Sequence, residues 1–109
     1  MKKPLFVLLA LLCMGAANAK TVKKTIEVNG NCATMCKPTI EKAAMSVKGV
    51  VSAKWNVKTH KMSLVFDDAK TTAEKVQKAI AAKGYDTESV RATDEAYNKL
   101  HQCCRYKRK

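Results

Sequence analysis

The sequence lacks a hydrophobic run long enough to cross a bilayer, and it has few acidic residues. Its one long apolar run, Leu5 to Leu12, is too short to span the hydrocarbon core, and no second run follows. With 21 Lys and Arg against 9 Asp and Glu, the formal net charge is +12. This excess fits either anionic partners or a solvated basic surface. Lysines are scattered over every segment and cluster only at Arg105 to Lys109, so charge alone does not assign a function.

The apolar run belongs to a predicted secretory signal peptide. Two lysines precede it, and residues 17–19 form an A-x-A cleavage site. A lipoprotein signal centred on Cys13 is the weaker interpretation, because Leu12 stands where a small residue is expected. We therefore expect residues 1–19 to be removed, the mature chain to begin at Lys20, and the product to be periplasmic or secreted. Export also argues against a genomic target, so we expect no nucleic-acid partner and at most peripheral membrane contact.

About 90 residues remain after cleavage, which is enough for one domain with a modest core. Alternating and helical apolar spacings predict six elements: a strand at 21–28, a helix from about 38 to 49, strands at 51–57 and 62–66, a helix at 71–84 and a strand from 85 to 90 or 91. Val51 and Met45 are expected to face the core, and Thr71 with Glu74 has the spacing of a capping box. This order predicts an α+β ferredoxin-like βαββαβ sandwich, with a four-stranded antiparallel sheet and both helices on one face.

Two thiols four positions apart, Cys32 and Cys36, lie between the first predicted strand and the first predicted helix. A loop that runs into a helix N-terminus suits a soft metal ion, because the positive end of the helix dipole stabilises thiolate over thiol. A disulfide over so short a loop would constrain little chain, whereas a bridge to the tail remains an alternative. Cu(I) accepts two thiolates nearly in line or three in a plane, while zinc prefers four ligands. Cu(I) is therefore the preferred ion, with Hg(II) and Zn(II) as alternatives.

The C-terminal segment, residues 92–109, is predicted to form a short helix from Thr93 to Cys104 followed by a basic tail. At about 1.5 Å per residue this helix covers roughly 18 Å. That is close to the roughly 20 Å spanned by the preceding strand, so a helix folded back along the sheet would return its cysteine pair to the loop. The alternatives are a disulfide within the pair, a separate site, or one cysteine that only packs. The candidate metal ligands are Cys32, Cys36, Cys103 and Cys104.

From about residue 21 to residue 90 the sequence resembles the heavy-metal-associated domain family. This module occurs in copper chaperones, in the N-terminal extensions of copper-pumping ATPases and in periplasmic mercury-binding proteins. The family pattern separates its two cysteines by two residues, whereas three separate Cys32 from Cys36, so the match is direct for Cys36 and approximate for Cys32. The resemblance is carried by Gly30, Cys36 with Glu41, Gly49-Val50, Val65-Phe66-Asp67-Asp68 and Lys83-Gly84-Tyr85.

The resemblance implies a binding protein rather than an enzyme, with a metal-binding domain at residues 20–91. It implies a periplasmic metallochaperone that passes Cu(I) by thiolate exchange to a metal-transporting ATPase or membrane transporter, as a monomer or a metal-bridged dimer. The alternatives are a mercuric ion scavenger of the same fold and a thiol-disulfide oxidoreductase that uses the same cysteines. The order of elements is not thioredoxin-like, which argues against the oxidoreductase. In the ferredoxin-like topology Tyr85 is expected to flank the metal loop.

Overall fold

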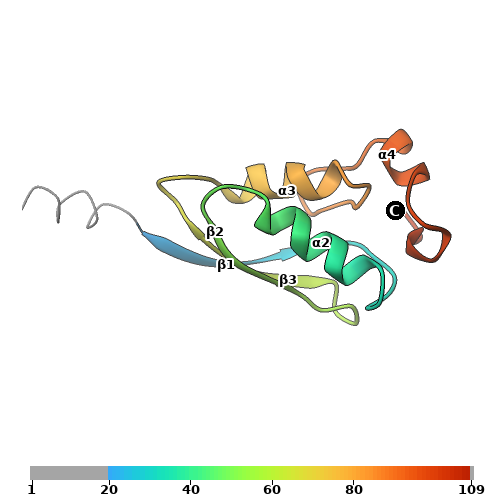
Figure 1. Cartoon of the computed structure of the whole chain (residues 1–109), viewed down its shortest axis with the longest axis horizontal. Helices are drawn as coiled ribbons and strands as arrows, with labels where there is room; N and C mark the ends of the chain where they lie inside the picture. Colours follow the sequence, from blue (N-terminus) through green and yellow to red (C-terminus); the bar gives the residue numbers. More distant parts are fainter. Residues whose placement is uncertain (1–19, 109) are drawn as a thin grey trace, which may run out of the picture.

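The computed structural model describes residues 20–108, so the predicted signal peptide lies outside the described residues. The α+β class is as predicted, and Figure 1 shows the two longer helices side by side over one face of a sheet. Within residues 20–108, no helix combines the length and apolarity needed to cross a membrane. The elements in chain order are β1 (Thr21–Glu27), α2 (Cys36–Met45), β2 (Val50–Trp55), β3 (Lys61–Asp67), α3 (Ala73–Ala81), α4 (Asp94–Asn98) and the one-turn 3-10 helix η1 (Gln102–Cys104).

The sheet is antiparallel with the strand order β1-β3-β2, so β3 is its centre. Successive side chains of a strand point to opposite faces, and the buried residues of β3 are therefore Met62, Leu64 and Phe66, at every second position. These side chains pack with buried residues of α2 and α3 to form the core. From the helices the core receives Ile40, Ala43, Ala44, Val76 and Ile80.

Two residues predicted to face the core are exposed instead. The register of β2 against β3 shifts between Val50 and Ser52. Such a bulge takes one residue out of the alternation, and Val51 is accordingly 57% exposed while Ala53 is buried. Met45, the last residue of α2, is 47% exposed.

Helix α3 begins one residue later than the predicted capping box. Thr72 is the N-cap, and its hydroxyl accepts a hydrogen bond from the backbone amide of Lys75 at 3.2 Å. Thr71, the predicted cap, is buried. The element itself is confirmed, with Val76 and Ile80 facing the core.

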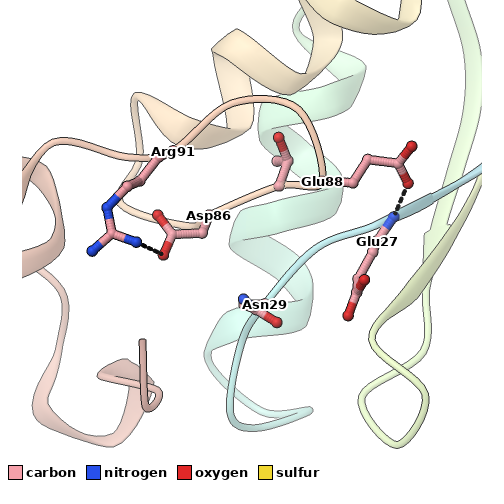
Figure 2. A pocket seen from close by; sticks show the side chains of 6 residues that line it. Glu27, Asn29, Asp86, Glu88 and Arg91 are labelled. Atoms are coloured by element: carbon pink, nitrogen blue, oxygen red, sulfur yellow. Dashed lines mark hydrogen bonds and ion pairs between the residues drawn. The ribbon is translucent and has the colours of Figure 1, made fainter. Parts of the chain in front are cut away.

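The predicted fourth strand, Tyr85–Val90, is not a strand in the described structure. A single antiparallel bridge joins Val28 to Thr87, so the sheet has three strands rather than four. The segment still lies along the end of β1, as Figure 2 shows. There the carboxylate of Glu88 accepts a hydrogen bond from the backbone amide of Glu27 at 2.8 Å.

Local hydrogen bonds explain why this segment turns away from the sheet. The backbone amide of Thr87 donates to the carbonyl of Val90 at 2.8 Å, which closes a turn. The side-chain oxygen of Gln77, buried on α3, accepts from the Thr87 hydroxyl at 2.8 Å and from the amide of Ser89 at 2.9 Å. The amide of Glu88 still donates to β1 at 3.0 Å, but the groups on either side of it bond within the turn and to α3, so the ladder does not continue.

The chain beyond Ala92 forms two short helical pieces rather than the predicted single helix. The predicted cap is correct, because the Thr93 hydroxyl accepts from the amide of Ala96 at 3.1 Å and starts α4. Leu100 is buried, and the backbone leaves helical geometry at His101, which has φ −54° and ψ 145°. We call residues 93–108 the C-terminal clasp. Figure 1 shows it at the same end of the molecule as the loop before α2.

Candidate metal site

The loop that carries Cys32 is fixed against the core by Trp55. The indole N–H donates to the carbonyl of Val28 at 2.9 Å, which holds the chain just before the loop. A Cβ atom on Gly30 would lie 2.9 Å from the indole ring and 3.1 Å from Ile40, so only glycine allows the backbone to approach this closely. The loop therefore begins at a defined position.

The start of α2, where Cys36 lies, is fixed by Glu41. Its carboxylate accepts from the backbone amide of Trp55 at 2.8 Å and from the ammonium of Lys37 at 2.6 Å. Burial alone would raise the pKa of Glu41, but these hydrogen bonds and the positive charge of Lys37 lower it, so the carboxylate stays ionised. The helix that carries the second thiol is thereby tied to β2.

The two loop thiols face each other. The sulfur atoms of Cys32 and Cys36 are 3.8 Å apart. Cys36 is fully buried as the first residue of α2, whereas Cys32 is half-buried on the loop. The pair therefore has one sulfur at the core and one open to an incoming ion.

The environment of Cys32 favours its thiolate. The backbone amide of Met35 donates to the Cys32 sulfur at 3.3 Å. This hydrogen bond, followed by one from the amide of Cys36, lowers the pKa of Cys32 to about 7. A thiolate rather than a thiol is the metal ligand, so a large fraction of Cys32 is ready to bind at neutral pH.

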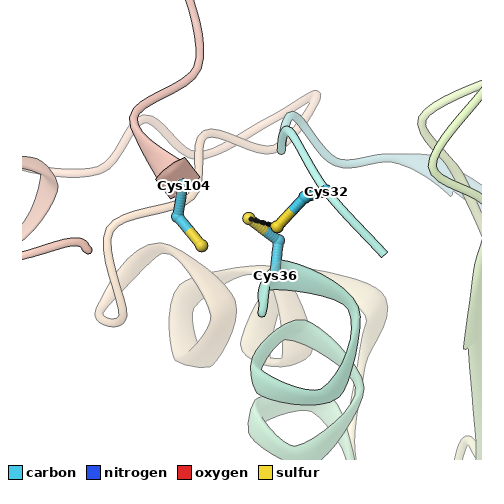
Figure 3. A group of neighbouring side chains, drawn as sticks. All are labelled: Cys32, Cys36 and Cys104. Atoms are coloured by element: carbon cyan, nitrogen blue, oxygen red, sulfur yellow. Dashed lines mark hydrogen bonds between the residues drawn. The ribbon is translucent and has the colours of Figure 1, made fainter. Parts of the chain in front are cut away.

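A third sulfur reaches the pair from the C-terminal clasp. The sulfur atoms of Cys32, Cys36 and Cys104 all lie within 4.8 Å of one another, and Figure 3 shows them converging on one point. Cys104 is buried in η1, and burial raises the pKa of its thiol. The four cysteines in the described part of the chain are all free.

Tyr85 lies beside this group of sulfurs, on the side expected from the topology. The residue is buried, and burial raises the pKa of its phenol, with further contributions from hydrogen bonding to Cys104 and from the charge of Cys36. A neutral phenol at this position can donate a hydrogen bond to sulfur.

The other candidates of the C-terminal segment are less involved. Cys103 is exposed and is not one of the three clustered thiols, although its thiol lies close enough to Cys32 to help lower the pKa of that residue. His101, whose imidazole could also bind a metal ion, is exposed as well. The structure thus gives the two cysteines of the predicted pair different positions: Cys104 is buried within the sulfur cluster, whereas Cys103 is exposed beside it.

Sequence reasoning missed the residues that hold the clasp in place. Tyr106 and Arg108 were assigned to a solvated basic tail, yet Tyr106 is buried and Arg108 forms an ion pair with the buried Asp86 at 2.8 Å. The available signal was an aromatic residue between basic ones, with a single acidic residue directly after the Gly84-Tyr85 turn.

Comparison with known proteins places this geometry among metal-binding domains. Residues 30–86 match the family model described as the heavy-metal-associated domain. The chain is 38% identical over 84 residues to the mercuric transport protein periplasmic component of Pseudomonas aeruginosa, covering 76% of this chain and 92% of that protein. It is 31% identical over 64 residues to the copper chaperone CopZ of Staphylococcus aureus, covering 59% of this chain and 94% of that one.

Solved structures give the same picture of the fold. The crystal structure of oxidized MerP from Ralstonia metallidurans superposes with a TM-score of 0.59 and 35% identity, over 63% of this chain and 96% of that one. A CopZ metallochaperone superposes with a TM-score of 0.58 and 30% identity, over 61% and 98%. The coarse ferredoxin-like prediction is supported by these neighbours, while the C-terminal clasp lies beyond the family match at residues 30–86.

Proposed function

The chain belongs to the heavy-metal-associated domain family, and on that premise we propose that it carries soft metal ions. Cys32 and Cys36 hold the ion, and the ion leaves by thiolate exchange to a partner that docks over the loop. The observation that carries this assignment is the pair of sulfur atoms 3.8 Å apart at the first turn of α2.

The chemistry of the pair selects the class of ion. Soft thiolate ligands favour soft ions such as Cu(I) and Hg(II) over hard cations such as magnesium and calcium, which prefer oxygen. The half-buried Cys32, with its lowered pKa of about 7, supplies the first thiolate. The buried Cys36 supplies the second, and its fixed place on α2 keeps the pair together.

We propose Cu(I) as the physiological ion and Hg(II) as the alternative. The relatives are named for copper chaperoning and for mercuric transport, and sulfur ligands accept either ion. The mercury alternative is favoured by one observation, the longer match to the mercuric transport protein, over 84 residues against 64.

The proposed setting is the periplasm, with a metal-transporting ATPase or membrane transporter as the partner. The predicted signal peptide at residues 1–19 and the periplasmic relatives support this location. The relatives are transport and chaperone proteins, which supports a role in binding and transfer without a catalysed reaction. The net positive charge would speed encounter with an acidic partner face.

The test is a titration of the reduced mature protein with Cu(I) and with Hg(II), each against a competing chelator. We expect one tightly bound ion per chain, and loss of tight binding in the double variant Cys32→Ala/Cys36→Ala, which removes both loop thiols. Met35→Leu is the matched control, because it removes an exposed sulfur next to Cys36 and should leave binding unchanged. Tight binding that survives in the double variant would refute the assignment. The ion that displaces the other in competition is the preferred ion.

A further inference from the structure

We propose that Cys104 is a third metal ligand, and that the C-terminal clasp thereby converts the two-cysteine loop into a closed three-thiolate site. This inference rests on the proposed function, because it concerns the same ion. It goes beyond that function, because the clasp lies outside the part of the chain that matches the family model.

The spacing of the sulfur atoms fits three ligands better than two. With a metal–sulfur bond of about 2.3 Å, two ligands in line would be about 4.6 Å apart, whereas three in a plane would be about 4.0 Å apart. The sulfurs of Cys32 and Cys36 are 3.8 Å apart, and that of Cys104 lies within 4.8 Å of both. A small adjustment of Cys104 completes a trigonal site, whereas a linear site would require the loop to spread.

The clasp is anchored directly behind Cys104 by Tyr106. The phenol donates to the carbonyl of Gly84 at 2.8 Å and accepts from the backbone amide of Asp86 at 2.7 Å. Tyr106 is 2% exposed, and its ring stacks on that of Tyr85 with 6.2 Å between ring centroids. Both contacts lie in the segment that borders the sulfur atoms, so the position of Cys104 follows from the fold of the domain.

A second anchor closes the end of the clasp. The guanidinium of Arg108 donates to both carboxylate oxygens of Asp86, at 3.0 and 2.8 Å, and to Asp94 of α4 at 2.9 Å. The cation also lies 4.8 Å from the ring centroid of Tyr97. One side chain therefore joins the last residues of the clasp to its first helix and to the domain.

The start of the clasp is packed against the turn after α3. A Cβ on Gly84 would lie 2.7 Å from the carbonyl oxygen of Ala96 and 2.9 Å from Leu100. Leu100 is itself buried in the core. The clasp is thus held at its beginning, at its end and immediately after Cys104. Such anchoring fixes the position of the Cys104 sulfur, which a metal ligand requires and a residue that only packs does not.

The experiment counts sulfur atoms around the ion. The mature protein is loaded with one equivalent of Cu(I) under a reductant that contains no sulfur, and X-ray absorption gives the number of sulfur neighbours. We expect three sulfurs in the unmodified protein and two in Cys104→Ala. Cys103→Ala is the matched control, because it removes an adjacent, exposed thiol and should retain three.

Each alternative outcome has a distinct meaning. Two sulfurs in the unmodified protein, with one Cu(I) tightly bound, overturn this inference and leave the proposed function intact. Failure to bind Cu(I) or Hg(II) tightly overturns both. If the third sulfur is lost in Cys103→Ala and retained in Cys104→Ala, then Cys103 is the third ligand and the proposal is refuted. If Cys104→Ala fails to fold, two sulfurs in the unmodified protein still overturn the proposal, and three sulfurs in both the unmodified protein and Cys103→Ala support it.

Discussion

Replacing Tyr106 by phenylalanine removes one oxygen atom and leaves two buried backbone groups without their partner. The hydroxyl accepts from the amide of Asp86 at 2.7 Å and donates to the carbonyl of Gly84 at 2.8 Å. A buried donor or acceptor that loses its partner costs about 1 to 3 kcal/mol, because it remains removed from water. The phenyl ring still fills its place between Tyr85 and Tyr97, so no large cavity is added to this cost.

We therefore expect Tyr106→Phe to lower the free energy of unfolding by at least about 2 kcal/mol, the sum of the smallest cost for each of the two groups. For a domain of this size that corresponds to a decrease of at least about 8 °C in the midpoint of thermal unfolding. The assay is thermal unfolding of the reduced, metal-free mature protein, followed by circular dichroism.

Tyr97→Phe is the matched control within the same clasp. Its hydroxyl donates to the carbonyl of Tyr106 in a part-buried hydrogen bond, whereas both hydrogen bonds of the Tyr106 hydroxyl are buried. We expect a loss of about 1 kcal/mol or less in this control. Equal midpoints for the two variants, or an unchanged midpoint in Tyr106→Phe, would refute the claim that the buried phenol anchors the clasp.

Three further outcomes are expected. Because its pKa is lowered to about 7, Cys32 in the apo protein should react with iodoacetamide with a half-maximal rate near pH 7, and the stability it contributes as a thiolate should be lost as the pH falls through that value. Gly84→Ala should lower stability by at least about 1 to 2 kcal/mol in urea unfolding, because the residue has φ +105° and no room for a Cβ. Burial opposes ionisation of Asp86, but Arg108 and a backbone amide hold the pKa of this carboxyl below its usual value. The ionised carboxylate therefore stabilises the fold at neutral pH, and this stabilisation is lost as the pH falls through the pKa of the folded state. Arg108→Gln should make the free energy of unfolding less dependent on acid pH, as measured by unfolding at several pH values.

Local patterns in the sequence were sufficient to predict the strands and helices whose apolar faces form the core. The alternation of Met62, Leu64 and Phe66 predicted the buried face of β3, and the loop position of Cys32 and Cys36 followed from the order of strand and helix. These features depend on neighbours within a few residues, which is the range over which apolar periodicity carries information.

Two of the predictions that failed depend on distant partners. The strand expected at 85–90 was replaced by a turn because Gln77, on another element, accepts the donors of Thr87 and Ser89. The basic tail was expected to be solvated, yet Arg108 meets Asp86, 22 positions earlier in the chain. Such pairings depend on the three-dimensional fold and leave no periodic trace in the sequence.

The helix length estimated from the sequence correctly predicted that the C-terminal segment returns to the loop, although the helix itself was predicted incorrectly. It assumed one continuous helix, whereas the chain makes two short helical pieces with a break at His101. The length was nevertheless sufficient, and after the break Cys104 is buried among the other sulfurs while Cys103 stays exposed.

The clasp is part of the same chain as the loop, so binding of the Cys104 sulfur to the ion is intramolecular. The effective concentration of this sulfur at the ion does not depend on the concentration of the protein. For short tethers this concentration is on the order of millimolar or higher. A small thiol in the surroundings would have to exceed it to take the third position. Dilution of the protein would not weaken the third bond either, as it would if a second copy of the chain supplied that sulfur.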